Sequence, residues 1–335
     1  MSVAIDAMGG DRAPDALVRG AINAARDHGV EIILVGIEDM LRETLKRQGG
    51  SNLPISIYPA SQIVDMEESP ADSLRHKKDS SIRVAFELVR QGKAKAVVSA
   101  GNSGATLATA MVALGRINGV RPAIATLMPT PKKPVAMIDV GANVDCKPIH
   151  LLQFGIMGSV FAGELLNNPR PRVGLLSIGE EDTKGNQLVK KAYDLLADSK
   201  LNFVGNVEGG EVFRGDVDVV VCDGFVGNIC LKLSEGLAKA ILTMLKSEIG
   251  EGLMADMGLR LKSAFKRFYK IIDYAEYGGA PLLGINGIAI ICHGLSASKA
   301  VKNAIQLADE LAKIELADKL EDSLAKRQDL FKVAQ

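Results

Sequence analysis

One stretch of the sequence has residue types and spacing that could bind an anion. Residues 99–106 read SAGNSGAT and lie between an apolar run at 94–98 and a further run at 107–114. If the first run is a strand and the second a helix, free backbone N–H groups and the positive end of the helix dipole face a ligand here. The stretch also has side-chain donors, namely Asn102, Ser103 and Thr106. The alternative is an ordinary strand-to-helix turn with Ser103 as the helix cap.

Further polar turns rich in glycine follow apolar runs at 6–11, 139–145, 177–186, 206–210 and 222–228. Together the turns supply the candidate substrate-binding residues: Asp6, Gly9, Gly10, Asp11, Gly101, Asn102, Ser103, Gly104, Asn143, Asp145, Asp223, Gly224 and Gly227. Aspartates in such turns often only accept hydrogen bonds from their own loop amides, and that alternative stays open for Asp11, Asp145 and Asp223.

Three residues are candidates for catalysis. Lys184 lies in a loop with Gly, Asp and Thr, where a cation could neutralise a phosphate or simply be solvated. His293 lies where a strand is expected to end, and Asn228 closes the turn at 222–228. Cys222 and Cys230 flank that turn and are expected to face the core.

The residues around Ser103 are similar to those around a serine nucleophile. The pattern Gly101-x-Ser103-x-Ala105 approaches the nucleophile elbow of α/β-hydrolases, but its last glycine is replaced by Ala105. A hydrolase of this kind would not need the several other turns that could bind an anion. No Walker pattern, full dinucleotide fingerprint or His-Glu-x-x-His occurs among only four histidines, so we expect no metal site.

Composition restricts the remaining classes. The 335 residues carry a formal net charge of zero and 4% aromatics, which disfavours a nucleic-acid partner and base-stacking surfaces. No apolar run is long enough to span a membrane, and no signal-peptide pattern occurs at the N-terminus. The four cysteines lack zinc-like spacing. We therefore expect a reduced, cytoplasmic chain.

Alternating strands and helices must position these residues. Strands are expected at 3–5, 31–36, 55–58, 95–99, 123–128, 135–139, 173–177, 217–222 and 285–292, and helices from Pro14 to 28 and at 38–48, 81–90, 107–114, 149–166, 229–249 and 296–334. This alternation predicts an α/β fold with a parallel sheet and helices on both faces. In open sheets of this kind, ligands bind beyond the carboxyl ends of the strands, where all of these polar turns are expected to lie.

Residues 253–277 depart from the alternation, because apolar residues at mostly helical spacing interleave with basic ones. Such a segment could lie on an anionic membrane or contact an acidic partner, and the alternative is a surface helix with a solvated basic face. The residues proposed for contact with such a membrane or partner are Arg260, Lys262, Phe265, Lys266, Arg267 and Lys270. The C-terminal helical tail at 309–335 is expected to pack on the body or on a subunit.

The motifs in combination resemble one family. The segments DAMGGD at 6–11, SAGNSGA at 99–105, DVGAN at 139–143 and CDGFVGN at 222–228, with YGGAPLLG at 277–284 and HG at 293–294, are similar to those of the bacterial phosphate acyltransferases. These are the acyl-ACP:phosphate acyltransferases of phospholipid synthesis. The similarity extends from about Val3 to Ala308.

The resemblance implies a Rossmann-like three-layer α/β/α fold, akin to isocitrate and isopropylmalate dehydrogenases and to phosphotransacetylases. It implies a single catalytic unit over 1–335 that forms a cytoplasmic homodimer without metal or nucleotide cofactor. Acyl-ACP and inorganic phosphate would give acyl phosphate and free ACP, and an integral-membrane glycerol-3-phosphate acyltransferase would use the acyl phosphate. An amphipathic helical hairpin at about 252–277 would attach the enzyme to the inner face of the cell membrane.

The chemistry requires that phosphate be held and aimed at a thioester carbonyl. The hypothesis is direct attack by phosphate, with donors from the turns at 102–104 and 223–228, Lys184 as the balancing cation and His293 as an orienting group or acid. Asn143 and Asp145 would line the same site. The alternatives are an esterase that uses Ser103 and a scaffold that binds phosphate or acyl groups without catalysis.

Overall fold

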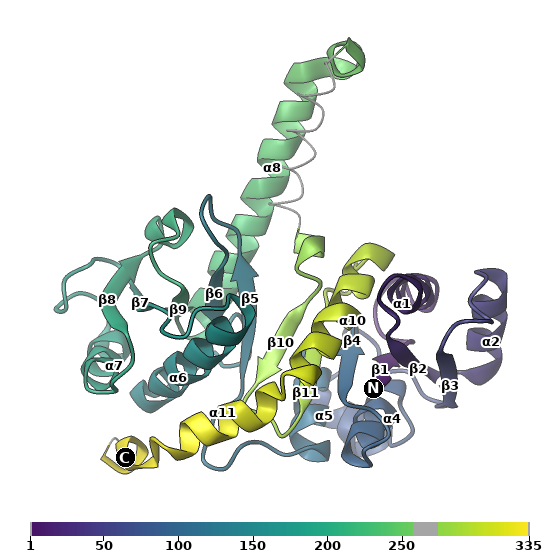
Figure 1. Ribbon diagram of the computed structural model, residues 1–335, viewed down its shortest axis with the longest axis horizontal. Coiled ribbons are helices and arrows are strands. Elements are labelled where there is room, and N and C mark those ends of the chain that lie inside the picture. The colour runs from purple at the N-terminus through teal and green to yellow at the C-terminus, as the bar shows by residue number, and fades with distance from the viewer. Residues whose placement is uncertain (1, 257–273, 334–335) are drawn as a thin grey trace.

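A mixed sheet of eleven strands forms the centre of the molecule (Figure 1). The computed structural model describes residues 2–256 and 274–333. The strand order is β3-β2-β1-β4-β11-β10-β5-β6-β9-β7-β8. The strands are β1 (Ser2–Asp6), β2 (Glu31–Gly36), β3 (Ile55–Pro59), β4 (Ala96–Ser99), β5 (Ala123–Met128), β6 (Val135–Ile138), β7 (Val173–Ser177), β8 (Phe203–Glu208), β9 (Val219–Val221), β10 (Ala280–Leu283) and β11 (Ile288–Ile291).

The sheet has two parallel halves that run in opposite senses. Strands β1 to β4 and β11 are parallel, and so are β6, β9, β7 and β8. Between the halves, β10 is antiparallel to both β11 and β5, and β5 is antiparallel to β6. The expectation of a wholly parallel sheet is therefore wrong. Residues 129–134 close a hairpin between β5 and β6, and strand periodicity alone does not distinguish a hairpin from a crossover.

Helices cover both faces of the sheet, as the sequence predicts (Figure 1). Helices α1, α6, α10 and α11 bury side chains such as Leu17, Phe154 and Ile305 in one core cluster. Helices α4 and α5 bury Phe86 and Ala110 in a second cluster on the other face. The helices are α1 (Asp15–His28), α2 (Glu38–Arg47), α3 (Pro70–His76), α4 (Ser81–Arg90), α5 (Ser103–Ala113), α6 (Pro148–Leu165), α7 (Gln187–Ala197), α8 (Gly224–Asp256), α10 (Ser298–Lys313), α11 (Leu316–Ala325) and α12 (Gln328–Val333).

Several element boundaries differ from the predicted ones. Helix α5 begins at Ser103 rather than 107, and α8 begins at Gly224 rather than 229. In both cases glycines lie within the first helical turn, where the sequence favours a loop. Residues 206–208 belong to β8 rather than to a turn, and α7 and β10 have no counterpart among the expected elements.

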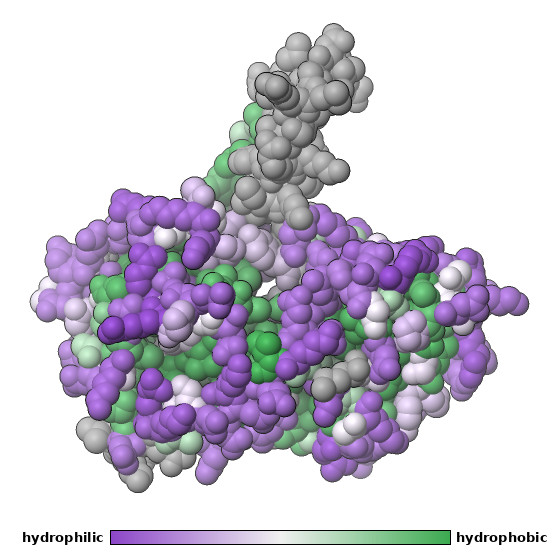
Figure 2. Space-filling view, in the orientation of Figure 1, coloured by the Kyte–Doolittle hydropathy of each residue, from purple (hydrophilic) through white to green (hydrophobic). Residues whose placement is uncertain are grey.

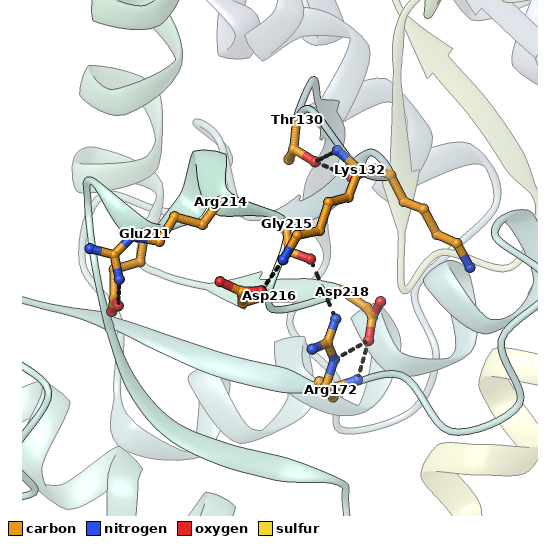
Figure 3. Close-up of polar contacts among 9 residues, drawn as sticks. Thr130, Lys132, Arg172, Glu211, Arg214, Gly215, Asp216 and Asp218 are labelled. Carbon is orange, nitrogen blue, oxygen red and sulfur yellow. Dashed lines mark hydrogen bonds and ion pairs between the residues drawn. The ribbon is translucent and has the colours of Figure 1, made fainter.

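Polar contacts fasten the β5–β6 hairpin to the segment that precedes β9 (Figure 3). Lys132 Nζ forms an ion pair with Asp216, and Thr130 Oγ1 donates to the Lys133 carbonyl at 2.6 Å. Beneath the hairpin, the Asp218 carboxylate accepts from the Arg172 N–H at 2.7 Å and from Arg172 Nε at 3.1 Å. The tip of the hairpin is thus held against the second half of the sheet.

The C-terminal helices pack on the body, while α8 projects from it (Figure 1). Leu311, Leu320 and Leu324 are buried in the core cluster that contains α6, and Lys319 pairs with Glu164 of α6 at 2.7 Å. The amphipathic segment lies largely outside the described residues, and with it Arg260, Lys262, Phe265, Lys266, Arg267 and Lys270. Within the two described ranges, no helix is long and apolar enough to cross a membrane.

Candidate functional site

A buried carboxylate underlies the turns after β1 and β4. Asp6 is 3% exposed, and its carboxylate accepts hydrogen bonds from Ser81 Oγ at 2.6 Å and Ser99 Oγ at 2.8 Å. Burial raises the pKa of Asp6, although the two serine hydrogen bonds act in the opposite direction. Asp6 therefore lies beneath the turn surface and can position the turns, rather than contact a ligand from solvent.

Glycines let these turns approach one another closely. A Cβ at Gly9 would lie 2.8 Å from the Gly101 nitrogen, and one at Gly10, whose φ is +93°, would lie 2.7 Å from the Ala100 carbonyl oxygen. The Asp11 N–H donates to the Gly294 carbonyl at 3.0 Å. The structure thus brings the expected residues at 6–11, 101–104 and 293–294 together at the ends of β1, β4 and β11.

The side chain of Asn102 is fully used within the protein. Its Oδ1 accepts from the Ala105 N–H at 3.0 Å and so caps α5, and its Nδ2 donates to the carbonyls of Met66 and Glu68, both at 2.9 Å. The backbone N–H groups of Ser103 and Gly104 have no hydrogen-bond partner in the described part of the chain, and both residues are exposed. The donors that α5 offers to an anion are therefore these N–H groups and the Ser103 hydroxyl.

His293 lies beside this helix terminus. It follows β11, which pairs with β4 up to Ile291 and Ser99, and the Cys292 N–H continues the pairing by donating to the Ser99 carbonyl at 2.8 Å. The His293 ring is exposed, and its Nδ1 accepts from the Leu295 N–H at 3.1 Å. In the neutral ring the proton then lies on Nε2, which is available as a donor.

A second group forms around the turn after β6. Asp139 is buried with a φ of +67°, and its carboxylate accepts from the N–H groups of Ala142 at 2.8 Å and Asn143 at 3.1 Å. Asn143 Nδ2 donates to Asp139 at 2.8 Å and to the Pro122 carbonyl at 2.7 Å, and its Oδ1 accepts from Arg121 Nε. Burial raises the pKa of Asp139. Asn143 is thus buried and holds the turn together.

The start of α8 packs directly on this turn. A Cβ at Gly224 would lie 2.7 Å from the Asn143 backbone, and one at Gly227 would lie 2.1 Å from the Asp139 carbonyl oxygen. Asp223 Oδ1 accepts from the N–H groups of Phe225 at 3.0 Å and Val226 at 2.9 Å. The carboxylate of Asp223 is therefore a helix cap, which is the alternative that the sequence left open.

The remaining candidates are exposed. Asn228 lies next to Gly141, and Asp145 follows on the same loop. Lys184 lies in the loop between β7 and α7, where its N–H donates to the Glu181 carbonyl at 3.0 Å, and its side chain forms no ion pair with any described residue. The strands that precede Lys184 and Asn228 run in the opposite sense to those that precede Ser103 and His293. Within residues 2–256 and 274–333, no hydrogen bond or ion pair joins the two groups.

The four thiols are poor nucleophiles. Burial, reinforced by the charges of Asp139 and Asp223, raises the pKa of Cys146 to about 12, and burial raises that of Cys292 to about 12. Cys222 and Cys230 have raised pKa values, chiefly through burial. All four therefore stay protonated at neutral pH.

Sequence reasoning missed Ser81, Ser99 and Arg121 as members of these groups. Ser99 lies within the motif that attracted attention, but Ser81 is 75 residues from its partner Asp6. Arg121 reaches Asn143 from the loop that precedes β5. Contacts over such separations leave no periodic signal in a single sequence.

Similarity to solved structures shows the class of fold to which this chain belongs. A phosphotransacetylase from Streptococcus pyogenes superposes with a TM-score of 0.65 over 93% of this chain and 94% of its own, at 16% identity. A branched-chain phosphotransacylase from Enterococcus faecalis superposes with a TM-score of 0.57 over 93% and 99%, at 14% identity. At such low identity the likeness shows the fold alone, which is a mixed α/β fold shared with phosphotransacylases.

The sequence then gives the family. A family model described as "Fatty acid synthesis protein" matches residues 1–319. The phosphate acyltransferases of Trichlorobacter lovleyi and Geobacter sulfurreducens are each 54% identical to this chain over 327 residues, which is 97% and 96% of this chain and 95% and 94% of theirs. The chain therefore belongs to the phosphate acyltransferase family and is an enzyme. These relatives do not favour the esterase alternative.

Proposed function

We propose that this enzyme transfers the acyl group of acyl-ACP to inorganic phosphate, giving acyl phosphate and free ACP in fatty acid and phospholipid synthesis. The observation that carries the proposal is 54% identity over nearly the full length to proteins named phosphate acyltransferase. The test incubates the purified protein with acyl-ACP and phosphate and traps acyl phosphate with hydroxylamine. Acyl hydroxamate is expected only when phosphate is present, and its absence with acyl-ACP intact would refute the activity.

The α5 terminus is the proposed phosphate site. The N–H groups of Ser103 and Gly104 and the Ser103 hydroxyl can bind phosphate oxygens, because no other described group uses these donors. The exposed Nε2 of His293 can orient the phosphate or act as the acid. Phosphate oxygen attacks the thioester carbonyl carbon and the ACP thiolate leaves, so that no acyl-enzyme forms.

Lys184 and Asn228 stay candidates for the balancing cation and for an oxyanion donor. Their exposure supports a role in substrate contact, whereas Asn143 and Asp223 support the start of α8, which carries Asn228. Single alanine variants of Lys184 and Asn228 separate the two contributions. A role in phosphate binding predicts a higher KM for phosphate, and a role in oxyanion stabilisation predicts a lower kcat by about 100-fold at unchanged KM.

We also propose a homodimer that uses α8. Six apolar side chains on this helix recur every three or four residues and are each at least 43% exposed: Phe225, Ile229, Leu233, Leu237, Ile241 and Met244. Figure 2 shows hydrophobic side chains along α8 where it leaves the body. A face of this length and spacing suits packing against a second helix. We further propose that the fold is akin to that of the isocitrate and isopropylmalate dehydrogenases.

Attachment to the inner face of the cell membrane is proposed for residues 252–277, next to the membrane-bound glycerol-3-phosphate acyltransferase that would take up the acyl phosphate. Its support is the alternation of basic and apolar residues in the sequence. Flotation with anionic liposomes is expected for the natural protein and not for a variant with Lys266, Arg267 and Lys270 changed to Glu. Equal flotation of both would refute electrostatic attachment.

A further inference from the structure

Basic residues gather where α6 begins. The Arg121 N–H donates to Gln153 Oε1 at 2.9 Å, which places the loop before β5 against the second turn of α6. Lys147 immediately precedes α6, and its N–H donates to His150 Nδ1 at 3.1 Å. Arg116 lies on the same loop as Arg121, at the point where that loop pairs with Ile285.

The cations of this cluster lie at the surface. Arg116, Arg121 and Lys147 are exposed, and none of them forms an ion pair with a residue that the structure describes. Burial lowers the pKa of His150, and the charges of Arg121, Lys147 and Arg116 act in the same direction.

None of the carboxylates in the neighbouring turns forms an ion pair with these cations in the described part of the chain. Asp139 is buried and accepts from the N–H groups of its own turn, and Asp223 caps α8. Asp145 is exposed on the same loop as Lys147. The start of α6 adds the positive end of its helix dipole to the cluster.

We propose that Arg116, Arg121 and Lys147 form a docking surface for an acidic protein, which in the reaction proposed above is the acyl carrier protein. This identification of the partner rests on the proposed function. The cations extend over two loops and are exposed, which suits an extended acidic surface better than a single small anion. Arg121 also contacts Asn143, on which α8 packs, so a bound carrier lies beside Asn228.

The test uses the full-length enzyme with Arg116→Glu and Lys147→Glu combined. Arg121 is left unchanged because it holds Asn143. The matched control is the pair Arg26→Glu and Lys46→Glu, two exposed cations on α1 and α2 in the other half of the sheet. Binding of fluorescently labelled carrier protein without an acyl chain is measured by anisotropy at about 50 mM and about 300 mM salt. The KM values for acyl-ACP and for phosphate are measured in parallel.

The docking surface predicts that the charge-reversed enzyme binds the carrier about tenfold more weakly at low salt, with a smaller difference at high salt. The KM of the charge-reversed enzyme for acyl-ACP rises, while its KM for phosphate equals that of the control variant. Unchanged carrier binding overturns the proposal, and so does a raised KM for phosphate alone, which would identify a small-anion site. A natural enzyme that binds the carrier but gives no phosphate-dependent turnover would instead refute the proposed function.

Discussion

Ser99 Oγ donates a 2.8 Å hydrogen bond to the buried carboxylate of Asp6 and accepts a 3.1 Å hydrogen bond from the Gly101 N–H. The end of β1 is thereby joined to the turn that carries Ser103. Because the hydroxyl bonds in both directions, its position fixes the path of the backbone that leads into α5.

We expect Ser99→Ala to lower the free energy of unfolding by about 1–3 kcal/mol, since it leaves two buried polar groups short of a partner. The KM for phosphate should rise as well, because the turn before α5 loses its support. The control is Ser81→Ala, which removes the other donor to Asp6 but does not touch Gly101. Urea unfolding and phosphate titrations measure both effects. Equal KM values for the two variants would contradict the role of Ser99 in positioning.

The raised pKa of Asp6 makes part of the stability depend on pH. Burial raises this pKa above its ordinary value of 3.8, so the native state holds the proton more tightly than the unfolded chain does. The favourable contribution is complete below 3.8 and is lost as the pH rises through the native pKa. Asp6→Asn stays neutral throughout. The free energy of unfolding of the natural protein, relative to this variant, should therefore fall as the pH rises above 3.8. A difference that rises with pH would contradict a raised pKa for Asp6.

Two glycines on the same helix should respond in opposite ways to alanine. A Cβ at Gly227 would lie 2.1 Å from the Asp139 carbonyl oxygen, whereas one at Gly236 meets nothing within 4 Å. We expect Gly227→Ala to destabilise the protein by about 3 kcal/mol or more and Gly236→Ala to stabilise it by about 0.5–1 kcal/mol. Thermal and urea unfolding of the two variants test this, and similar values would show that α8 does not pack on the turn as described.

These glycines also show what a single sequence can and cannot predict. Gly224 and Gly227 favour a loop by propensity, yet they lie within α8 because the backbone of the turn at 139–143 occupies the space of their side chains. The apolar strands and most helices are predictable from periodicity. The antiparallel pairing of β10 and β5 with their neighbours is not, because strand direction depends on partners far along the chain.

The candidate site also has parts that a single sequence predicts and parts that it does not. The turns at 6–11 and 99–104 were predictable as neighbours, because parallel strands place their ends at one edge. Lys184 and Asn228 could not be placed relative to His293, since that depends on the number of antiparallel pairs between the two halves. Asn102 and Asp223 have residue types that suit either a ligand or a helix cap, and only their hydrogen bonds show that both are caps.

The exposed apolar face of α8 predicts an effect on assembly. Leu233→Glu combined with Leu237→Glu should convert the proposed homodimer to a monomer, because two charges would be buried in the contact. The control is Val112→Glu, which changes an equally exposed apolar residue on α5. Sedimentation velocity at several protein concentrations distinguishes the species. A natural protein that sediments as a monomer, or a double variant that stays dimeric, would refute the interface on α8.

Whether phosphate itself attacks the thioester is tested by following the oxygen atoms. The purified enzyme is given acyl-ACP and phosphate labelled with ¹⁸O, and the acyl phosphate is then cleaved at its P–O bond so that the acyl group keeps the bridging oxygen. Direct attack predicts ¹⁸O in the fatty acid that is recovered and free ACP released only when phosphate is present. Release of ACP without phosphate would contradict direct attack, whether the acyl group appears as unlabelled fatty acid or stays bound to the enzyme in one equivalent.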